Sequence, residues 1–191
     1  RGLTQRTAAP LKTLLLGGSI NPELVERLLR EARTAGTLDH AGIVAVHEAG
    51  LLDGIPYFAM AYVRGRTLHE VMRAGERPGV RERAELLWQA AEAVAHAHQH
   101  RIVHRDLKPA NLLVDAEGRI HVMDFGLAKR MDEKTDLTRA GQVLGTPQYM
   151  PPEQIDGELD RIGPASDVYA LGAVLYEALT GRPPFEGASM P

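Results

Sequence analysis

The chain has 191 residues, of which 44% are hydrophobic and 25% are charged, a composition typical of a folded globular protein and unlike that of a disordered tail. A formal net charge of −3 at pH 7 and a pI near 6.3 provide no general attraction for nucleic acid or for an anionic membrane. The absence of cysteine excludes disulfides, thiolate metal sites and a cysteine nucleophile, and it agrees with a reducing cytosol.

The first sixty residues are predicted to form a small sheet with one helix. Leucines surround a lone Lys12 between residues 8 and 16, and a glycine pair follows, as expected where a strand ends. An Asn-Pro pair then begins an amphipathic helix that carries Glu31. Two further strands are expected at residues 43–49 and 57–62, because a Leu-Asp-Gly turn separates them.

The middle of the chain is predicted to be helical. After a connector at residues 64–66, Thr67 and Glu70 have the spacing of a capping box at the start of a short helix. A long helix is expected from about residue 81 to residue 100, and the charged run at residues 77–83 is interpreted as its solvated start. Three histidines near its end lack a carboxylate or cysteine partner at metal-ligand spacing, so they are expected to be core or surface residues.

A hairpin and a second long helix are predicted in the remaining part. Short strands at residues 112–115 and 120–123 flank an Ala-Glu-Gly turn, whose glycine can adopt a positive φ. The later helix, at residues 166–180, is apolar nearly all round and ends at Gly181. We therefore expect it to lie at the centre of its part of the molecule.

Two motifs on either side of the hairpin contain the candidate reactive residues. His-Arg-Asp-Leu-Lys-Pro-Ala-Asn occupies residues 104–111, and Asp-Phe-Gly occupies residues 124–126. They provide a carboxylate for an attacking hydroxyl, a cation for a travelling phosphate and two oxygen ligands for a metal. A lone Asp-x-Gly would by default only close a loop. In this order, around a hairpin, the motifs resemble the catalytic loop and the metal-binding loop of the protein kinase family.

The resemblance implies a role for each reactive residue. Asp106 orients or accepts the proton of the substrate hydroxyl, and Lys108 reaches the γ-phosphate of ATP. Asn111 and Asp124 hold Mg²⁺, which prefers oxygen ligands and keeps water and phosphate oxygens of its own. The alternative, in which both aspartates only cap turns, is outweighed by the two motifs together.

Two further residues are matched to the family by spacing. By resemblance, Lys12 on the first strand and Glu31 on the following helix form the ion pair that holds the α- and β-phosphates of ATP. The alternative for Lys12 is a solvent-facing strand lysine. Pro10 departs from the family pattern at the position that normally packs on adenine, and it removes a backbone donor from the strand.

The adenine site of such kinases is formed by backbone groups of the connector between two lobes. The stretch at residues 57–63 resembles that strand and connector, with Met60 as the gatekeeper. Ala61 and Val63 would offer a backbone carbonyl and a backbone amide, and Leu113 would support the adenine from below. An ordinary strand core residue is an equally compatible reading of Leu113.

The stretch between Asp124 and Glu153 resembles an activation segment, ending in Pro-Pro-Glu where the family usually has Ala-Pro-Glu. A phosphate on Thr138 is predicted to pair with Arg105 and to order the segment, whereas the alternative is a solvated loop threonine.

Two positions indicate the class of substrate. Lys108 together with Thr146 matches the kinases that act on serine and threonine. Ala110 stands where several arginine-directed members of the family place glutamate, so a strict preference for basic peptides is not expected.

Other matches to the family are structural. His104, Phe125, Ala35 and Val46 match the stacked internal spine of a kinase, and Asp167 resembles the helix aspartate that anchors the backbone of the catalytic loop. These residues are expected to support the site without taking part in its chemistry.

The fold implied by the resemblance is α+β and two-lobed. A small β-rich lobe is expected at residues 1–62, a hinge at 63–66, and a larger, mostly helical lobe at 67–191. No G-x-G-x-x-G strand precedes Lys12, and the arginine that usually pairs with Glu153 is absent, so an incomplete domain is expected, with Glu153 left unpartnered.

The resulting hypothesis is an ATP-dependent and Mg²⁺-dependent kinase that phosphorylates serine and threonine hydroxyls of proteins in the cytoplasm. One alternative is a pseudokinase that binds partners without catalysis. Another is a phosphotransferase for small molecules, which the Gly-Thr-Pro sequence at residues 145–147 disfavours. No apolar run reaches the roughly 18 residues that span a bilayer, so any membrane anchor would lie outside this segment.

Overall fold

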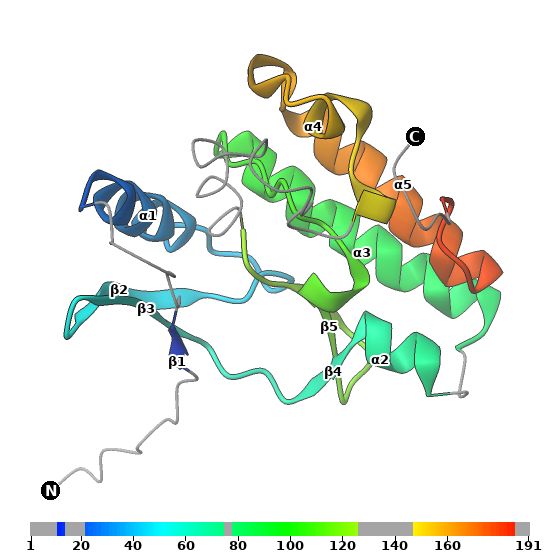
Figure 1. Cartoon of the computed structure of the whole chain (residues 1–191). Coiled ribbons are helices and arrows are strands. Elements are labelled where there is room, and N and C mark those ends of the chain that lie inside the picture. The colour runs from blue at the N-terminus through cyan, green and yellow to red at the C-terminus, as the bar shows by residue number, and fades with distance from the viewer. Residues whose placement is uncertain (1–10, 14–21, 75–77, 126–146, 186–191) are drawn as a thin grey trace, which may run out of the picture.

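The computed structural model describes residues 11–13, 22–74, 78–125 and 147–185. Two groups of elements make up this part of the chain, a three-stranded sheet with one helix and a second three-stranded sheet with the other helices (Figure 1). The strands are β1 (Leu11–Thr13), β2 (Val46–Leu52), β3 (Ile55–Met60), β4 (Gly65–Thr67), β5 (Leu112–Asp115) and β6 (Ile120–Val122). The helices are α1 (Pro22–Ala35), α2 (Leu68–Arg73), α3 (Val80–Gln99), α4 (Pro152–Ile155) and α5 (Pro164–Thr180), with single 3₁₀ turns η1 (Pro109–Asn111), η3 (Pro147–Tyr149) and η4 (Leu159–Arg161).

The first group is an antiparallel sheet in the order β1-β3-β2, covered by α1. Asp53 and Gly54 form the tight turn between β2 and β3, and both adopt positive φ angles, as a two-residue hairpin turn requires. Ala32 of α1 packs against Phe58 and Met60 of β3, and these three buried side chains form the core of this group. Their packing fixes α1 against the sheet.

The expected strand at residues 43–49 begins later than predicted, at Val46. The preceding residues turn instead toward the second group, where Ile43 makes an isolated parallel bridge to Val122 of β6. The Val44 amide donates to the Val122 carbonyl at 2.9 Å, and the Val122 amide donates to the Gly42 carbonyl at 2.8 Å. This bridge joins the two groups.

The expected connector is also shifted. Residues 61–64 have no regular structure, whereas Gly65 already begins β4, which pairs with β5.

The capping box is confirmed: the Thr67 hydroxyl accepts from the Glu70 amide at 3.2 Å, and the Glu70 carboxylate accepts from the Thr67 amide at 2.7 Å. The second sheet therefore leads directly into α2.

The second group has the sheet order β4-β5-β6; α3 lies against this sheet, and α5 packs beside α3 (Figure 1). The hairpin between β5 and β6 is confirmed, with Gly118 at a φ of 76°. Its core is made by fully buried residues of the sheet and of the two long helices: Leu112, Ile120, Val122, Ala90, Val94 and Val174.

Helix α5 is less buried than its sequence suggests. It ends at Gly181 with a φ of 83°, as expected. Its Ala-rich side, including Ala170 and Ala178, packs into the core beside α3, but Val168 is 63% exposed and Tyr176 is 41% exposed. The described residues cover only one side of this helix, so the expected central position is not seen in this part of the chain.

No helix within the described ranges is both long enough and apolar enough to cross a membrane.

Gly65 is predicted to be essential for joining β4 to β5. A Cβ atom at this position would lie 2.2 Å from the carbonyl oxygen of Val114, a contact that only a backbone shift can relieve. We expect Gly65→Ala to reduce the free energy of unfolding by about 1–3 kcal/mol in urea denaturation. Gly172→Ala is the control, because the position is helical with open space around it, and there alanine should stabilise by about 0.5–1 kcal/mol. An unchanged Gly65→Ala stability would contradict the register of this strand pair.

The carboxyl of Asp115, at the start of the hairpin turn, is predicted to make the stability of the fold depend on pH. Burial by itself raises the pKa of its carboxyl, but hydrogen bonds from His121 and from the backbone and side chain of Arg119 outweigh burial and lower the pKa to about 2. Because the folded-state pKa is depressed, this carboxylate stabilises the fold above about pH 4 and loses that contribution as the pH falls toward 2. Urea unfolding of wild type and Asp115→Asn should show a stability difference at pH 6 that shrinks below pH 4, and a difference that does not change with pH would contradict this assignment.

Candidate active site

The predicted catalytic loop forms one hydrogen-bonded unit. Lys108 Nζ donates to Asp106 Oδ2 at 2.7 Å, and both side chains are about three-quarters buried. Asn111 Nδ2 donates to the same Oδ2 at 3.1 Å and to the Asp106 backbone carbonyl at 2.7 Å. Two donors therefore fix the orientation of the Asp106 carboxylate.

The backbone brings Asp124 next to this unit. The Met123 amide donates to the Asn111 carbonyl at 3.0 Å, so the residue before Asp124 is bonded directly to the catalytic loop. Asp124 itself has a φ of 64°, a left-handed conformation that is uncommon for a non-glycine residue and that clusters at functional sites. The structure thus brings the two predicted metal ligands, Asn111 and Asp124, to adjacent backbone positions.

Asp167 of α5 holds the catalytic loop from below. Its side chain is 1% exposed, and its two oxygens accept from the amides of His104 and Arg105, each at 2.8 Å. His98 of α3 donates from Nε2 to the same carboxylate at 2.7 Å. A buried carboxylate is stable only when its oxygens are satisfied in this way. The predicted anchoring contact is present, and His98 is an additional part of it.

Arg105 is held in a strained conformation between two anchors. Its φ is 68°, its amide donates to Asp167 and its carbonyl accepts from Gln154 Nε2 at 2.9 Å. A non-glycine residue keeps such a backbone only when its surroundings over-determine it. The two anchors set the direction in which the chain enters Asp106.

His104 links the catalytic loop to the segment before Asp124. Burial lowers the pKa of its imidazole, so it is neutral near pH 7. Nε2 donates to the Met123 carbonyl at 2.9 Å, and Nδ1 accepts from the Asp106 amide at 3.2 Å. The ring also lies 4.8 Å from the ring of Phe125, and Phe125 belongs to the same buried cluster as Ala35 of α1. The predicted stacking of His104 on Phe125 is therefore present, whereas Val46 packs against the separate cluster of Ala32, Phe58 and Met60.

Glu31 of α1 lines a cavity of about 170 Å³, and Arg105 and Phe125 line the same cavity. The helix thus brings Glu31 close to the catalytic loop. Lys12 lies on β1 in register with Phe58 of β3, but its side chain lies outside the described part of the structure. The ion pair between Lys12 and Glu31 stays a prediction.

The predicted adenine site lies at the junction of the two groups. Met60 ends β3 and is buried against α1, and the Ala61 amide donates to the Ala45 carbonyl at 2.8 Å. The Ala61 carbonyl and the Val63 amide make no hydrogen bond with any described residue. In β5, Leu112 is in the core, so the half-buried Leu113 faces the other side of the sheet.

Two residues singled out from the sequence are not described by the structure, and the prediction for a third is wrong. Thr138 and Thr146 lie outside the described residues. The expectation that Glu153 lacks a partner is wrong, because Ser166 Oγ donates to its carboxylate at 2.6 Å. This hydrogen bond is the main cause that lowers the pKa of Glu153.

Three supporting residues have no signal in the sequence. His98, Gln154 and Ser166 contact residues that are 69, 49 and 13 positions away in the chain. Such contacts depend on how α3, α4 and α5 pack, and no local spacing in the sequence indicates them.

The donor set is suited to Mg²⁺. The hydrogen bonds of Asn111 use its nitrogen, which leaves the amide oxygen as the atom that can coordinate a cation, and Asp124 adds carboxylate oxygens. Within the described residues, no three His, Asp or Glu side chains cluster closely enough to hold a metal by themselves. Two protein oxygen ligands, completed by water and phosphate oxygens, are typical of Mg²⁺ at phosphoryl-transfer sites.

Comparison with known proteins agrees with this geometry. A model of the protein kinase domain matches residues 6–190. PrkC, a serine/threonine-protein kinase of Bacillus subtilis, is 44% identical over 179 residues, which are 94% of this chain and 27% of PrkC. PknB, a serine/threonine-protein kinase of Mycobacterium tuberculosis strain H37Rv, is 40% identical over 195 residues, or 99% of this chain and 31% of PknB. The chain therefore spans about a third or less of the length of these relatives.

Solved structures show the same fold. The kinase domain of PknI from Mycobacterium tuberculosis, in a form with a single substitution, superimposes with a TM-score of 0.73 at 29% sequence identity. The match covers 92% of this chain and 65% of that one.

Replacing Asp167 should loosen the catalytic loop. In Asp167→Asn, one oxygen acceptor becomes an NH₂ donor that faces a backbone amide, and the charge that strengthens the remaining bonds is lost. We expect a loss of about 1.5–3 kcal/mol in the free energy of unfolding and faster hydrogen exchange at the amides of His104 and Arg105. Asp156→Asn, an exposed aspartate, is the matched control. Unchanged exchange at both amides would show that Asp167 does not hold the loop.

Proposed function

The chain belongs to the protein kinase family, and on that premise we propose that it transfers the γ-phosphoryl group of ATP to serine and threonine hydroxyls of proteins. The observation that carries this proposal is the unit formed by Asp106, Lys108 and Asn111, bonded through Met123 to the residue before Asp124. The names of PrkC and PknB, both serine/threonine-protein kinases, support the same acceptor groups.

In this proposal, Asp106 orients the substrate hydroxyl and accepts its proton. The hydrogen bonds from Lys108 and Asn111 to Oδ2 hold the carboxylate in a fixed direction, which is the main requirement for a positioned base. Lys108 Nζ lies 2.7 Å from Oδ2, so its charge can be shared between the base and the oxygens of the incoming phosphoryl group.

Asn111 Oδ1 and the Asp124 carboxylate would hold Mg²⁺. The bound ion would neutralise negative charge on the phosphate oxygens. The chain's own contribution is to keep both ligands rigid: Asn111 is held by Asp106, and the residue before Asp124 is bonded to the Asn111 carbonyl and to His104.

ATP would lie between the two groups of elements, which correspond to the small and large lobes. We assign the adenine to the connector, where the Ala61 carbonyl and the Val63 amide provide an acceptor and a donor beside Met60. Leu113 would close the site from the large-lobe side. Glu31 would pair with Lys12 to hold the α- and β-phosphates.

We place this reaction in the cytoplasm, with proteins as partners. The lack of cysteine suits a reducing compartment, and the net charge of −3 suits neither nucleic acid nor an anionic membrane as a partner.

Asp106→Asn should abolish most phosphoryl transfer. The change keeps the size of the side chain but removes the proton acceptor, so we expect kcat to fall by about 10²–10⁴. Incorporation of radiolabel from ATP labelled at the γ-phosphate into a generic protein substrate, with the full-length protein and Mg²⁺, measures this directly. Asp160→Asn, in the exposed turn η4, is the control and should keep wild-type activity.

Two outcomes would contradict the proposal. Equal transfer by wild type and Asp106→Asn would remove Asp106 from the chemistry. Binding of ATP by a folded wild-type protein that labels no protein substrate would favour the alternative of a pseudokinase that acts as a docking module.

A further inference from the structure

Three histidine rings contact one another where the end of α3 meets the loop that follows α1. His40 lies in that loop, His96 lies in the last turn of α3, and His100 is the C-cap of the helix. The ring centroids of His40 and His96 are 5.0 Å apart, and those of His96 and His100 are 4.5 Å apart. We call these three residues the histidine cluster, and the loop at residues 36–45 the junction loop.

The junction loop is bonded to both sides of the proposed nucleotide site. Its Gly42 carbonyl and its Val44 amide bond to Val122 of β6, the strand that leads to the Asp-Phe-Gly motif. Its Ala45 carbonyl accepts from the amide of Ala61 in the connector. One loop therefore holds both the strand before the proposed metal ligand and the backbone that we assign to the adenine.

His40 closes the turn of the junction loop. The Gly42 amide donates to His40 Nδ1 at 3.0 Å, so this nitrogen carries no proton. Gly42 also approaches α3 closely: a Cβ atom there would lie 3.2 Å from the Cβ of Ala93 and 3.3 Å from the His40 ring. Protonation of His40 at Nδ1 would remove the acceptor of the Gly42 amide at a tightly packed position.

His96 lies between the other two rings and is kept neutral by its surroundings. Its Nε2 atom is buried and has no hydrogen-bond partner among the described residues, so an added proton there would have no acceptor. Burial lowers the pKa of the His96 imidazole, and the neighbouring His100 and His40 lower it further, which outweighs the carboxylate of Asp39. A neutral His96 is therefore the form that fits this packing.

His100 is the exposed member of the histidine cluster. Its Nδ1 donates to the His96 carbonyl at 2.9 Å, which holds the ring at the end of the helix. As the pH falls, protonation of this ring would place a positive charge beside the ring of His96. The charged side chains next to the cluster along α3, Glu92 and Arg101, are exposed and opposite in sign, so their effects oppose each other.

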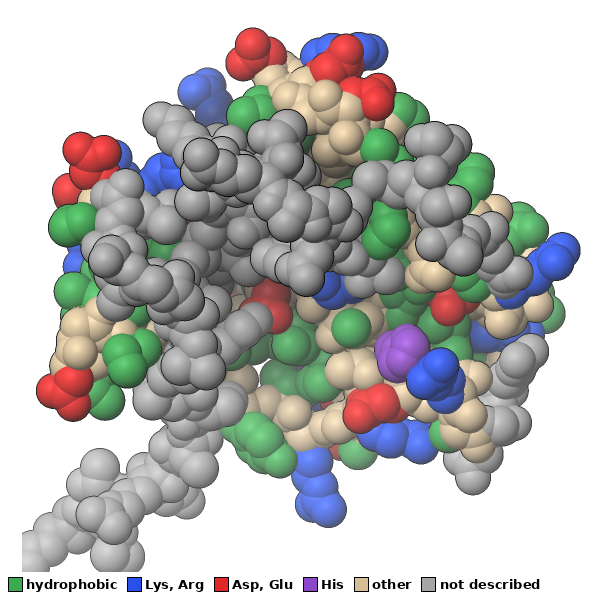
Figure 2. Space-filling model, viewed as in Figure 1, with side chains coloured by type: hydrophobic (Ala, Val, Ile, Leu, Met, Phe, Trp, Pro, Cys, Tyr) green, Lys and Arg blue, Asp and Glu red, His purple; other side chains and the backbone are tan. Residues whose placement is uncertain are grey.

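The other five histidines differ from the histidine cluster. His47 is exposed, and Figure 2 shows a histidine at the surface over α2, where the sequence has His69. The remaining three each donate to an oxygen atom, His98 to Asp167, His104 to the Met123 carbonyl and His121 to Asp115. Within the described ranges, imidazole rings contact one another only in the histidine cluster.

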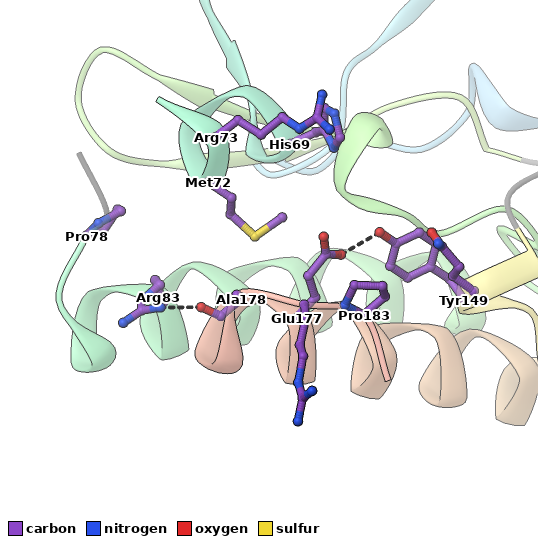
Figure 3. Close-up of a pocket in the computed structure, with 12 residues that line it drawn as sticks. His69, Met72, Arg73, Pro78, Arg83, Tyr149, Glu177, Ala178 and Pro183 are labelled. Atoms are coloured by element: carbon purple, nitrogen blue, oxygen red, sulfur yellow. Dashed lines mark hydrogen bonds between the residues drawn. The ribbon is translucent and has the colours of Figure 1, made fainter. Parts of the chain in front are cut away.

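The donors of two other contacts in the large lobe keep their charge near neutral pH. Figure 3 shows Tyr149 pointing toward Glu177, to which it donates, and Arg83 donating to the Ala178 carbonyl. Burial and the neighbouring Glu177 raise the pKa of Tyr149, and a guanidinium stays protonated. The Arg83 contact also corrects the interpretation of residues 77–83 as a wholly solvated helix start.

We propose that the histidine cluster is a pH-sensitive contact, which holds the junction loop on α3 while its rings are neutral and releases the loop when they are protonated, so that ATP binds more weakly in acid. The effect on ATP rests on the proposed function. Protonation would remove the acceptor of the Gly42 amide and place like charges on rings that are no more than 5.0 Å apart from their neighbours.

The dependence of stability on pH has the same direction. The folded-state pKa of His96 lies below the value of 6.5 expected for the unfolded chain. The contribution of His96 to the free energy of unfolding is therefore fully present above about pH 6.5 and is lost as the pH falls through the folded-state pKa.

The test measures the Kd of a non-hydrolysable ATP analogue with Mg²⁺ for the full-length protein at pH 7.5 and at pH 5.5. In the double variant His40→Asn with His96→Phe, the asparagine oxygen can still accept from Gly42 and the phenylalanine keeps a ring, but neither side chain titrates. We expect Kd to rise about fivefold more in wild type than in the double variant, the lower end of typical couplings between two sites. Titration of the phosphates of the analogue affects both proteins equally.

Two further variants complete the comparison. His47→Asn removes an exposed histidine of β2 that lies outside the histidine cluster, so it should keep the wild-type response to acid. His100→Gln changes an exposed side chain and should reduce the response to acid without disturbing the fold. It tests the proposal even if the double variant does not fold.

Hydrogen exchange without nucleotide separates this inference from the proposed function. The amides of Gly42 and Val44, after correction for the intrinsic effect of pH, should exchange faster at pH 5.5 in wild type than in the double variant or in His100→Gln. Such release in a protein that binds no nucleotide at either pH would support the histidine contact and contradict the proposed function.

The proposal is overturned if wild type, the double variant and His100→Gln respond equally to acid. It is also overturned if both amides exchange at the same corrected rate at the two pH values, even when the nucleotide binds. A response to acid that His47→Asn abolishes would assign the effect to another histidine.

Discussion

The buried carboxylate of Asp167 accepts hydrogen bonds from two backbone amides, and the rest of the site depends on this interaction. Asp167 binds the amides of His104 and Arg105, and Gln154 binds the Arg105 carbonyl from the other direction. These contacts hold Arg105, the residue directly before Asp106, in a left-handed backbone conformation. The strain is therefore held by the large lobe, whose core lies between α3 and α5, and under the proposed function the Asp106 carboxylate would need little reorganisation.

The same loop couples the two halves of the proposed nucleotide site. His104 bonds to Met123, and its ring meets Phe125, which packs in the same cluster as Ala35 of the small lobe. A neutral imidazole suits this position, because it can accept from one amide and donate to one carbonyl at the same time.

Much of the catalytic loop could be predicted from the sequence, because its residues are neighbours in the chain. Asp106, Lys108 and Asn111 lie within one short loop, so the motif sufficed to predict that their side chains lie together. Contacts that join distant elements were not predictable in this way. The bond from Ser166 to Glu153 and the one from His98 to Asp167 arise only when the helices pack together. The central position expected for α5 is not seen, because its sequence is also apolar on sides that the described residues leave uncovered.

The most direct test of the central claim is a crystal structure of the protein with Mg²⁺ and a non-hydrolysable ATP analogue. We predict that the Asn111 amide oxygen and the Asp124 carboxylate coordinate the metal, that Lys108 contacts the γ-phosphate, and that the adenine meets the backbone of Ala61 and Val63. A nucleotide bound elsewhere, or a metal ion held by neither Asn111 nor Asp124, would contradict the account.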